Sequence, residues 1–118
     1  MIILDKEITT TEIKNNYAGE DGFIKGVVDI EKAFVALDAE MHYMLSDYLK
    51  EQKNSKENNI WGFNLWLLET DEDQILEFDS FINIRNNQAH GFLRGGMSIE
   101  DENIKNTAKE VIKKWIKF

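Results

Sequence analysis

The sequence contains no cysteine and no proline. Without cysteine, disulfides, thiolate metal sites and cysteine nucleophiles are all excluded. No apolar run approaches the roughly 20 residues that a membrane-spanning helix needs. The first residues, Met-Ile-Ile-Leu-Asp-Lys, lack the basic segment and the long apolar segment of a secretion signal. We therefore expect a soluble, cytoplasmic chain whose stability comes from packing.

Basic residues are also in short supply, with 14 Lys and Arg against 22 Asp and Glu and a net charge of −8. This charge opposes binding to nucleic acid or anionic lipid, because phosphate binding depends on Lys and Arg displacing counterions. We therefore expect neither as a partner. The one visible basic cluster is Lys105, Lys109, Lys113, Lys114 and Lys117. Its position near the end of a predicted helix is typical of cations that meet the helix dipole.

No internal repeat, linker or low-complexity tract interrupts the 118 residues. This length suffices for one core, and about two thirds of the unfolded surface can be buried at that size. The sequence therefore predicts a single domain over residues 1–118.

The N-terminal part predicts a strand over 2–8 and then a short helix. Thr9 and Glu12 form the Thr-x-x-Glu pattern of a capping box, which marks a helix start. Glycines 19 and 22 end this helix. Farther along, apolar residues at helical spacing predict an amphipathic helix over 40–50.

The segment from Phe23 to Ala39 fits two structures. One apolar set has helical spacing, and another fits two strands with a turn near Glu31 and Lys32. The first set is Ile24, Val27, Ile30, Phe34, Leu37 and Met41, and the second is Val28, Ile30, Val35 and Leu37. Periodicity leaves both alternatives open.

Two later segments alternate apolar and polar residues with a period of two, which indicates strands over 60–68 and 75–85. The polar residues between them are few enough to close an antiparallel hairpin. Pairing across that turn would bring Asn64 near Asp79, and Trp66 near Glu77, on the polar face.

A glycine-bearing loop over 91–96 leads to a last helix with one apolar stripe. The stripe consists of Ile104, Ala108, Val111, Ile112, Trp115 and Phe118. We expect this apolar stripe to pack against the apolar side of the predicted hairpin. The sequence therefore predicts an α+β fold, in which helices pack mainly on one face of an antiparallel sheet of about five strands, as a two-layer sandwich.

Four segments carry a resemblance to a known family. They read VVDIEK at 27–32, EMH at 40–42, IWGFN at 60–64 and FDSFINIR at 78–85. In this order they resemble a family of short archaeal and bacterial proteins of unknown function, over nearly the whole chain. The resemblance implies the two-strand alternative for residues 23–39, because relatives carry glycines there. It implies no activity.

The polar face of the predicted hairpin is the first candidate site. Asn64, Asp79, Asn83 and Arg85 are predicted to bind a ligand there, because they offer hydrogen-bond donors and acceptors beside aromatic surface. The aromatic surface comes from Trp66 and Phe81, which also permit a subunit interface and hence a homodimer.

Two further residue patterns suggest chemistry. Arg85 and His90 have the Arg-x4-His spacing that resembles the active-site motif of helical nucleotidyltransferase-associated ribonucleases. That motif requires both residues on one helix of an all-α bundle, whereas this segment is predicted to be extended. Glu40 and His42 supply only two metal ligands, so no metal site is predicted.

Three function hypotheses follow. A noncatalytic module that binds a small molecule or a protein through the polar face is preferred over an enzyme. The alternatives are a metal-independent ribonuclease that uses Arg85 and His90, and a small acidic immunity or antitoxin factor that neutralises a partner. The sequence gives no basis for a cofactor.

Overall fold

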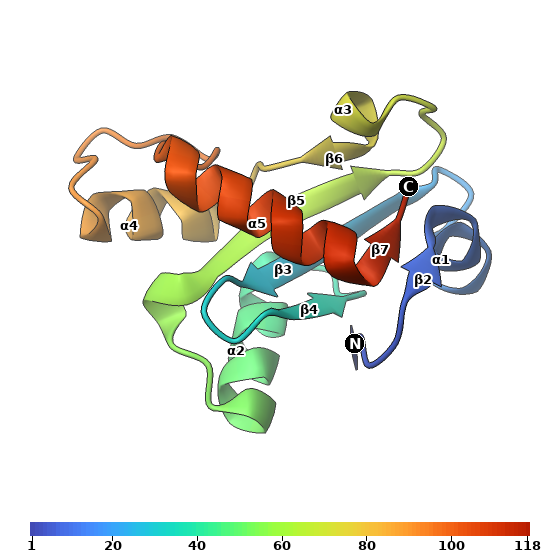
Figure 1. The fold of residues 1–118 in the computed structure, drawn as a ribbon, viewed down its shortest axis with the longest axis horizontal. Coiled ribbons are helices and arrows are strands. Elements are labelled where there is room, and N and C mark those ends of the chain that lie inside the picture. Colours follow the sequence, from blue (N-terminus) through green and yellow to red (C-terminus); the bar gives the residue numbers. More distant parts are fainter.

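The computed structural model describes residues 1–118, with a five-stranded sheet, a second sheet of two short strands, and helices on both sides of the larger sheet (Figure 1). The strands are β1 (Ile2–Ile3), β2 (Ile8–Thr9), β3 (Phe23–Asp29), β4 (Phe34–Leu37), β5 (Ile60–Trp66), β6 (Leu76–Glu77) and β7 (Ile116–Lys117). The helices are α1 (Thr10–Asn16), α2 (His42–Lys53), the 3-10 turn η1 (Glu57–Asn59), α3 (Glu72–Ile75), α4 (Phe81–Ala89) and α5 (Glu102–Trp115).

The large sheet has the order β1-β4-β3-β5-β6, and all its pairs are antiparallel. The central strand β3 pairs with β5 along its whole length, from Phe23 opposite Trp66 to Asp29 opposite Ile60. The predicted α+β class and the five-stranded antiparallel sheet are confirmed.

Helices cover both faces of this sheet. Figure 1 shows α5 in front of the strands and α2 behind them. The core on the α5 side includes Val28, Val35, Trp61, Phe63, Ala108 and Ile112. The core on the α2 side consists of Val27, Ala36, Leu45, Leu49 and Ile60. Because neighbouring residues such as Val27 and Val28 point to opposite faces, both sides of β3 are apolar. The sandwich therefore has a third layer beyond the two expected.

The two-strand alternative for residues 23–39 is confirmed, and the helical one is wrong. Strands β3 and β4 form a hairpin whose turn is held by Asp29. Its Oδ1 atom accepts hydrogen bonds from the backbone N–H groups of Glu31 (2.9 Å) and Lys32 (3.0 Å). Ala33 has a positive φ of 60° in this turn. Local side-chain-to-backbone bonding of this kind favours a turn over a helix.

The N-terminal segment contains two short strands where one strand over 2–8 was predicted. The charged residues between Leu4 and Ile8 are exposed and leave the sheet. Strand β1 pairs with β4, whereas β2 pairs in parallel with β7, with Ile8 opposite Ile116. The predicted capping box is confirmed, because Thr9 Oγ1 accepts from the N–H of Glu12 at 3.1 Å.

The strand predicted over 75–85 is wrong for most of its length. Only Leu76–Glu77 forms a strand, and α4 begins at Phe81. Ser80 caps α4, with its side chain accepting a hydrogen bond from the N–H of Ile82 at 3.4 Å. The pairing of β6 with β5 is limited to two positions, Asn64 opposite Glu77 and Leu65 opposite Leu76.

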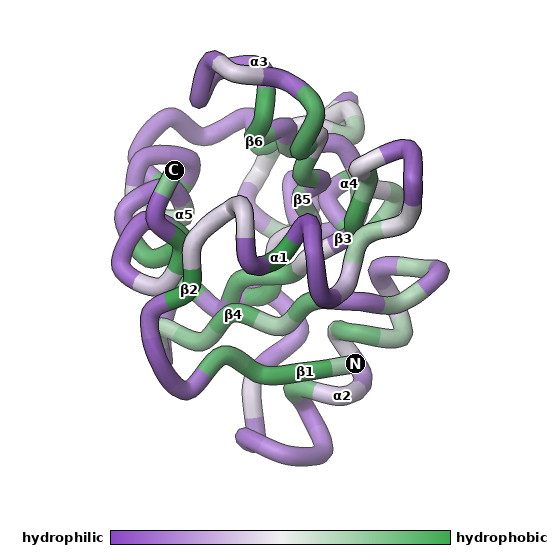
Figure 2. The backbone as a smooth tube through the Cα atoms, turned by 90° about the vertical axis from the view of Figure 1, so that its right-hand side faces the viewer, coloured by the Kyte–Doolittle hydropathy of each residue, from purple (hydrophilic) through white to green (hydrophobic).

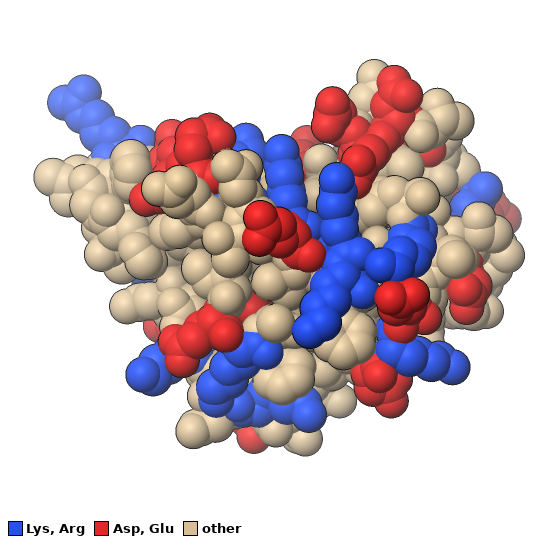
Figure 3. Space-filling model, in the orientation of Figure 1, with Lys and Arg blue, Asp and Glu red and all other residues tan.

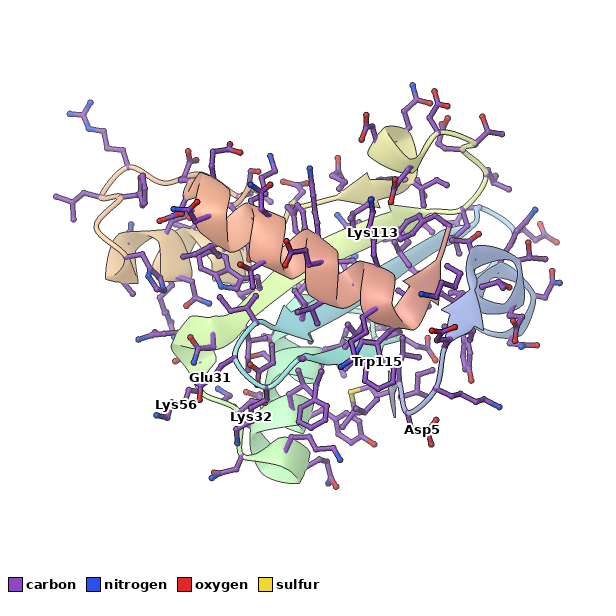
Figure 4. All side chains as sticks on the ribbon, viewed as in Figure 1. Asp5, Glu31, Lys32, Lys56, Lys113 and Trp115 are labelled. Atoms are coloured by element: carbon purple, nitrogen blue, oxygen red, sulfur yellow. The ribbon has the colours of Figure 1, made fainter.

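The last helix, α5, places its apolar residues from Ile104 to Trp115 on the sheet as predicted. Phe118, the last member of the predicted stripe, lies beyond the helix and is 39% exposed. Trp115 also donates its indole N–H to the carbonyl of Ala33 at 2.8 Å, which ties the helix to the β3–β4 turn (Figure 4). Figure 2 shows hydrophobic backbone stretches along the strands and hydrophilic ones in the loops. None of the helices combines the length and the apolar character that crossing a bilayer requires.

Candidate functional site

Two of the four predicted ligand-binding residues lie together on the α2 side of the large sheet. Asn64 on β5 is buried, and its Nδ2 atom donates to the carbonyl of Asp79 and to Oε1 of Glu77, both at 3.1 Å. Trp66 donates its indole N–H to the same Glu77 oxygen at 3.0 Å. The pairing of β5 with β6 is shifted by two residues from the predicted register, because Asn64 lies opposite Glu77 and not opposite Asp79. Both predicted pairs, Asn64 with Asp79 and Trp66 with Glu77, are nevertheless in contact.

We call the surface formed by Phe23, Lys25, Asn64, Trp66, Glu77 and Asp79 the polar sheet face. Alternation along β3, β5 and β6 directs the side chains of the first five to the α2 side. Helix α2 packs over Val27, Ala36 and Ile60 on the same side and leaves this end of the strands open. Trp66 is 41% exposed as a result.

Aromatic rings form part of the polar sheet face. The rings of Phe23 and Trp66 have centroids 4.4 Å apart and planes inclined at 49°, within the range of a favourable aromatic pair. The ammonium of Lys25 lies 4.7 Å from the centroid of the Phe23 ring, in cation–π contact. The face thus offers aromatic surface, an ammonium and two carboxylates side by side.

His42 is the first residue of α2 and lies beside the polar sheet face. From the sequence it was considered only as a metal ligand. It is buried, and its Nε2 atom lies 2.9 Å from the carbonyl of Phe63, so Nε2 carries the proton. Burial lowers the pKa of His42 below its ordinary value of 6.5, and Lys25 adds to this effect. The Phe63 carbonyl, Asn64 and Asp79 act in the opposite direction. The imidazole is therefore neutral at pH 7.

Asn83, the third predicted binding residue, lies inside the protein on α4. Its Oδ1 atom accepts from the N–H of Gly62 at 2.8 Å, and its Nδ2 atom donates to the carbonyls of Gly62 and Met97, both at 2.9 Å. The side chain is fully buried. Its hydrogen bonds are thus used within the fold, and it does not reach the polar sheet face.

Arg85 lies on α4, and His90 directly follows this helix. The sequence instead predicted Arg85 at the end of a strand. The guanidinium of Arg85 is 74% exposed and pairs with Glu57 at 3.3 Å. His90 Nε2 lies 3.3 Å from the carbonyl of Asn58. The sheet excludes the all-α bundle that the ribonuclease motif requires. Arg85 instead lines a pocket between α2 and α4. None of the other three predicted residues, Asn64, Asp79 and Asn83, lines this pocket.

A groove of about 930 Å³ runs between α5 and the segment that carries α3 and β6. Lys105, Lys109 and Lys113 recur every four residues along its α5 wall, and acidic side chains lie on the other wall. Lys113 bridges the groove by an ion pair with Glu72 at 2.8 Å. Figure 3 shows basic side chains over the region of α5, with acidic side chains on either side of them, and Figure 4 labels Lys113 at the α5 wall. Trp66 lies where the groove meets the polar sheet face.

Sequence reasoning did not identify Phe23 or Lys25 as members of the site, and it placed Glu77 on the polar face without including it among the ligand-binding residues. A signal was present, because the alternation of Phe23 and Lys25 in β3 places both on one side of a strand. That signal was masked by the competing helical spacing of the same segment. No group of three or more His, Asp or Glu side chains is placed to hold a metal ion.

The fold and the site define an α+β protein with an open polar and aromatic sheet face. The chain belongs to the family described as "Protein of unknown function (DUF5674)", whose family model matches residues 2–115. The match confirms that the chain resembles, over nearly its whole length, a family of proteins of unknown function. Neither a curated protein nor a solved structure matches the chain.

Proposed function

We propose that the chain is a noncatalytic protein-binding module that uses the polar sheet face. The observation that carries this proposal is the Phe23–Trp66 pair, with Trp66 exposed and Phe23 half-buried, at an end of the sheet that no helix covers. Exposed aromatic residues with a polar handle are enriched at protein interfaces, where they bury a large area at low entropic cost. Small-molecule sites, by contrast, enclose most of their ligand. This face lies open.

The charges indicate the chemistry of the partner. Glu77 and Asp79 supply carboxylates, the aromatic rings favour cations, and the chain carries a net charge of −8. A partner with a basic contact surface complements these features, whereas a second copy of the chain adds like charge. The same chemistry suits an acidic protein that neutralises a basic partner, as an immunity or antitoxin factor does.

The network around Asn64 prepares the face for binding. Glu77 accepts hydrogen bonds from both Asn64 and Trp66, so the carboxylate and the indole ring are held in place before a partner arrives. Preorganised side chains lose less conformational entropy on association. Trp66 is therefore the residue we expect to contribute most to affinity.

Substitution of Trp66 tests the proposal. Partners are captured from cells with the wild-type chain and identified, and one purified partner is then titrated by calorimetry. We expect Trp66→Ala to weaken this binding by roughly tenfold or more, as for a central interface aromatic. We also expect wild-type affinity to fall as salt rises.

Phe92→Ala is the matched control, because Phe92 is 38% exposed and lies in the loop between α4 and α5. The proposal is wrong if Trp66→Ala binds as tightly as wild type while Phe92→Ala does not. Light scattering settles the homodimer alternative. A mass of twice 13.8 kDa that Trp66→Ala reduces to 13.8 kDa would identify a second copy as the partner.

A further inference from the structure

Three lysines form a row on the α5 wall of the 930 Å³ groove, which we call the α3–α5 groove. Lys105, Lys109 and Lys113 are spaced four residues apart, so their side chains project from one side of the helix. Like charges at this spacing destabilise a helix. The row is therefore unfavourable for α5 taken alone, and its charges must be compensated from outside the helix.

The helix dipole accounts for only one end of the row. Lys113 lies in the last turn of α5, where the dipole stabilises a cation. Helix α5 begins at Glu102, so Lys105 lies near its N-terminal end, where the dipole offers a cation no stabilisation. Lys109 lies in the middle of the helix, beyond the reach of either terminus. The dipole therefore explains Lys113 but not Lys105 or Lys109.

Ion pairs within the chain also compensate only Lys113, which pairs with Glu72 across the groove at 2.8 Å. Lys105 and Lys109 form no ion pair with any residue of the chain. Both are nevertheless partly buried. A cation that loses part of its hydration without a counter-charge is unfavourable. These two lysines therefore favour an occupant of the groove that brings anionic groups to its α5 wall.

The opposite wall of the groove carries charge of the other sign. Glu69 and Asp73 line the groove, are exposed and form no ion pair. A polyanion such as nucleic acid would meet these carboxylates as well as the net charge of −8. The groove is thus complementary to an occupant with anionic groups on one side and cationic groups on the other.

An extended polypeptide has this arrangement of side chains. Successive side chains of a strand point to opposite sides, and those on one side repeat at about 7 Å. Residues four apart in α5 repeat at about 6 Å along the helix axis. From this match and the two charged walls, we infer that the α3–α5 groove binds an extended segment of a partner protein in which acidic and basic residues alternate. The inference rests on the proposed function only in taking the occupant to be a protein.

Two peptides of identical composition test this inference. Acetyl-Glu-Lys-Glu-Lys-Glu-Lys-amide alternates its charges, whereas acetyl-Glu-Glu-Glu-Lys-Lys-Lys-amide carries them in blocks. Titration with the alternating peptide, followed by ¹H–¹⁵N NMR, should give saturable shifts of the amides of Leu76, Phe78 and Lys109. We expect the block peptide to bind roughly fivefold more weakly, because half of its side chains face a wall of like charge. Equal binding of the two peptides would overturn the inference, as would shifts confined to residues outside the groove.

The double variant Lys105→Gln/Lys109→Gln removes the two unpaired charges and keeps most of each side chain. We expect it to bind the alternating peptide roughly fivefold more weakly than wild type. Lys114→Gln/Lys117→Gln is the matched control, since it makes the same change of charge at two exposed positions outside the groove. An equal loss of binding in both double variants would contradict the assignment, because net charge alone would then explain it.

Glu69→Gln/Asp73→Gln tests the opposite wall and keeps the test valid if the lysine variant does not fold. It should also weaken binding of the alternating peptide, and unchanged binding would contradict the role of this wall.

Hexathymidylate distinguishes a protein segment from a nucleic acid. It carries phosphates and no cationic group, so we expect it to bind more weakly than the alternating peptide. Tighter binding of hexathymidylate would identify a polyanion as the occupant and overturn the inference. All these titrations use the chain without its partner. A failure here is therefore distinct from a failure of the proposed function, which the binding of the partner to Trp66→Ala tests.

Discussion

At the scale of single residues, His42 links the fold to the polar sheet face. It begins α2, its ring contacts the backbone of β5 through the Phe63 carbonyl, and its pKa responds to Lys25 and Asp79 on the face. Gly62 lies next to it, and a Cβ atom at that position would lie 3.2 Å from the His42 ring and 2.5 Å from Cβ of Ser80. Because residue 62 is glycine, the backbone of β5 can closely approach α2 at His42 and the N-cap of α4 at Ser80.

The lowered pKa of His42 predicts how stability depends on pH. Below the ordinary value of 6.5, the unfolded chain binds a proton at His42 while the folded chain still resists it. The unfolded state then binds more protons, so the free energy of unfolding falls as pH falls through this window and is fully retained above it. We expect His42→Gln to lose less stability than wild type between pH 7 and pH 5, as measured by urea denaturation.

His90→Gln is the control for this prediction, because it replaces the other histidine, which is exposed. It should keep the pH dependence of wild type over the same range. The interpretation of His42 fails if His42→Gln and wild type lose stability in parallel.

At the scale of elements, α4 is attached to its surroundings by asparagines. Asn83, Asn86 and Asn87 are buried at spacings that place them on one side of the helix. Each donates to two backbone carbonyls, and the carbonyls lie in η1, in β5 and in the loop before α5. Asn87 also accepts a hydrogen bond from the N–H of Glu100 at 3.0 Å. These amides satisfy backbone groups that have no strand partner.

Removal of one such amide should be costly. Asn83→Ala leaves the N–H and carbonyl of Gly62 without their partner and removes one of the two hydrogen bonds that the Met97 carbonyl accepts, the other coming from the N–H of Ser80. We expect the free energy of unfolding to fall by about 2 kcal/mol or more in urea denaturation. Gln88→Ala, an exposed position on the same helix, should change it by less than about 0.5 kcal/mol. A similar small loss in Asn83→Ala would show that the asparagine contacts contribute little.

The asparagines also explain why α4 could not be predicted from the sequence. A surface helix is normally recognised by an apolar stripe, but the buried side of α4 is polar. The apolar residues Leu76, Phe78, Ile82 and Ile84 instead share a period of two, which runs from β6 through the cap into the helix. Ser80 was the available local signal, since serine is a preferred helix N-cap.

Other elements were predictable because their signals are local. The Thr9–Glu12 capping box, the alternation over β5 and the apolar stripe of α5 each need only neighbouring residues. Within the candidate site, Asn64 and Asp79 lie in contact, as the sequence predicted. Asn83 and Arg85 were separated from them because α4 replaced the second strand.

At the scale of the whole molecule, the distribution of helices determines which surface stays open. Helix α5 covers one side of the sheet, and α2 covers only part of the other. The polar sheet face is the remaining part, and it adjoins the α3–α5 groove at Trp66. This open aromatic surface and the acidic charge of the chain are the grounds on which we propose a basic protein partner.

Hydroxyl-radical footprinting of the chain, alone and in complex with its identified partner, tests this account most directly. Oxidation of Trp66 and Phe23 should drop at least severalfold in the complex, because the partner covers the polar sheet face. Phe92, in the distant loop between α4 and α5, should be oxidised equally in both states. Unchanged oxidation of Trp66 and Phe23, with protection at Phe92 instead, would contradict the account.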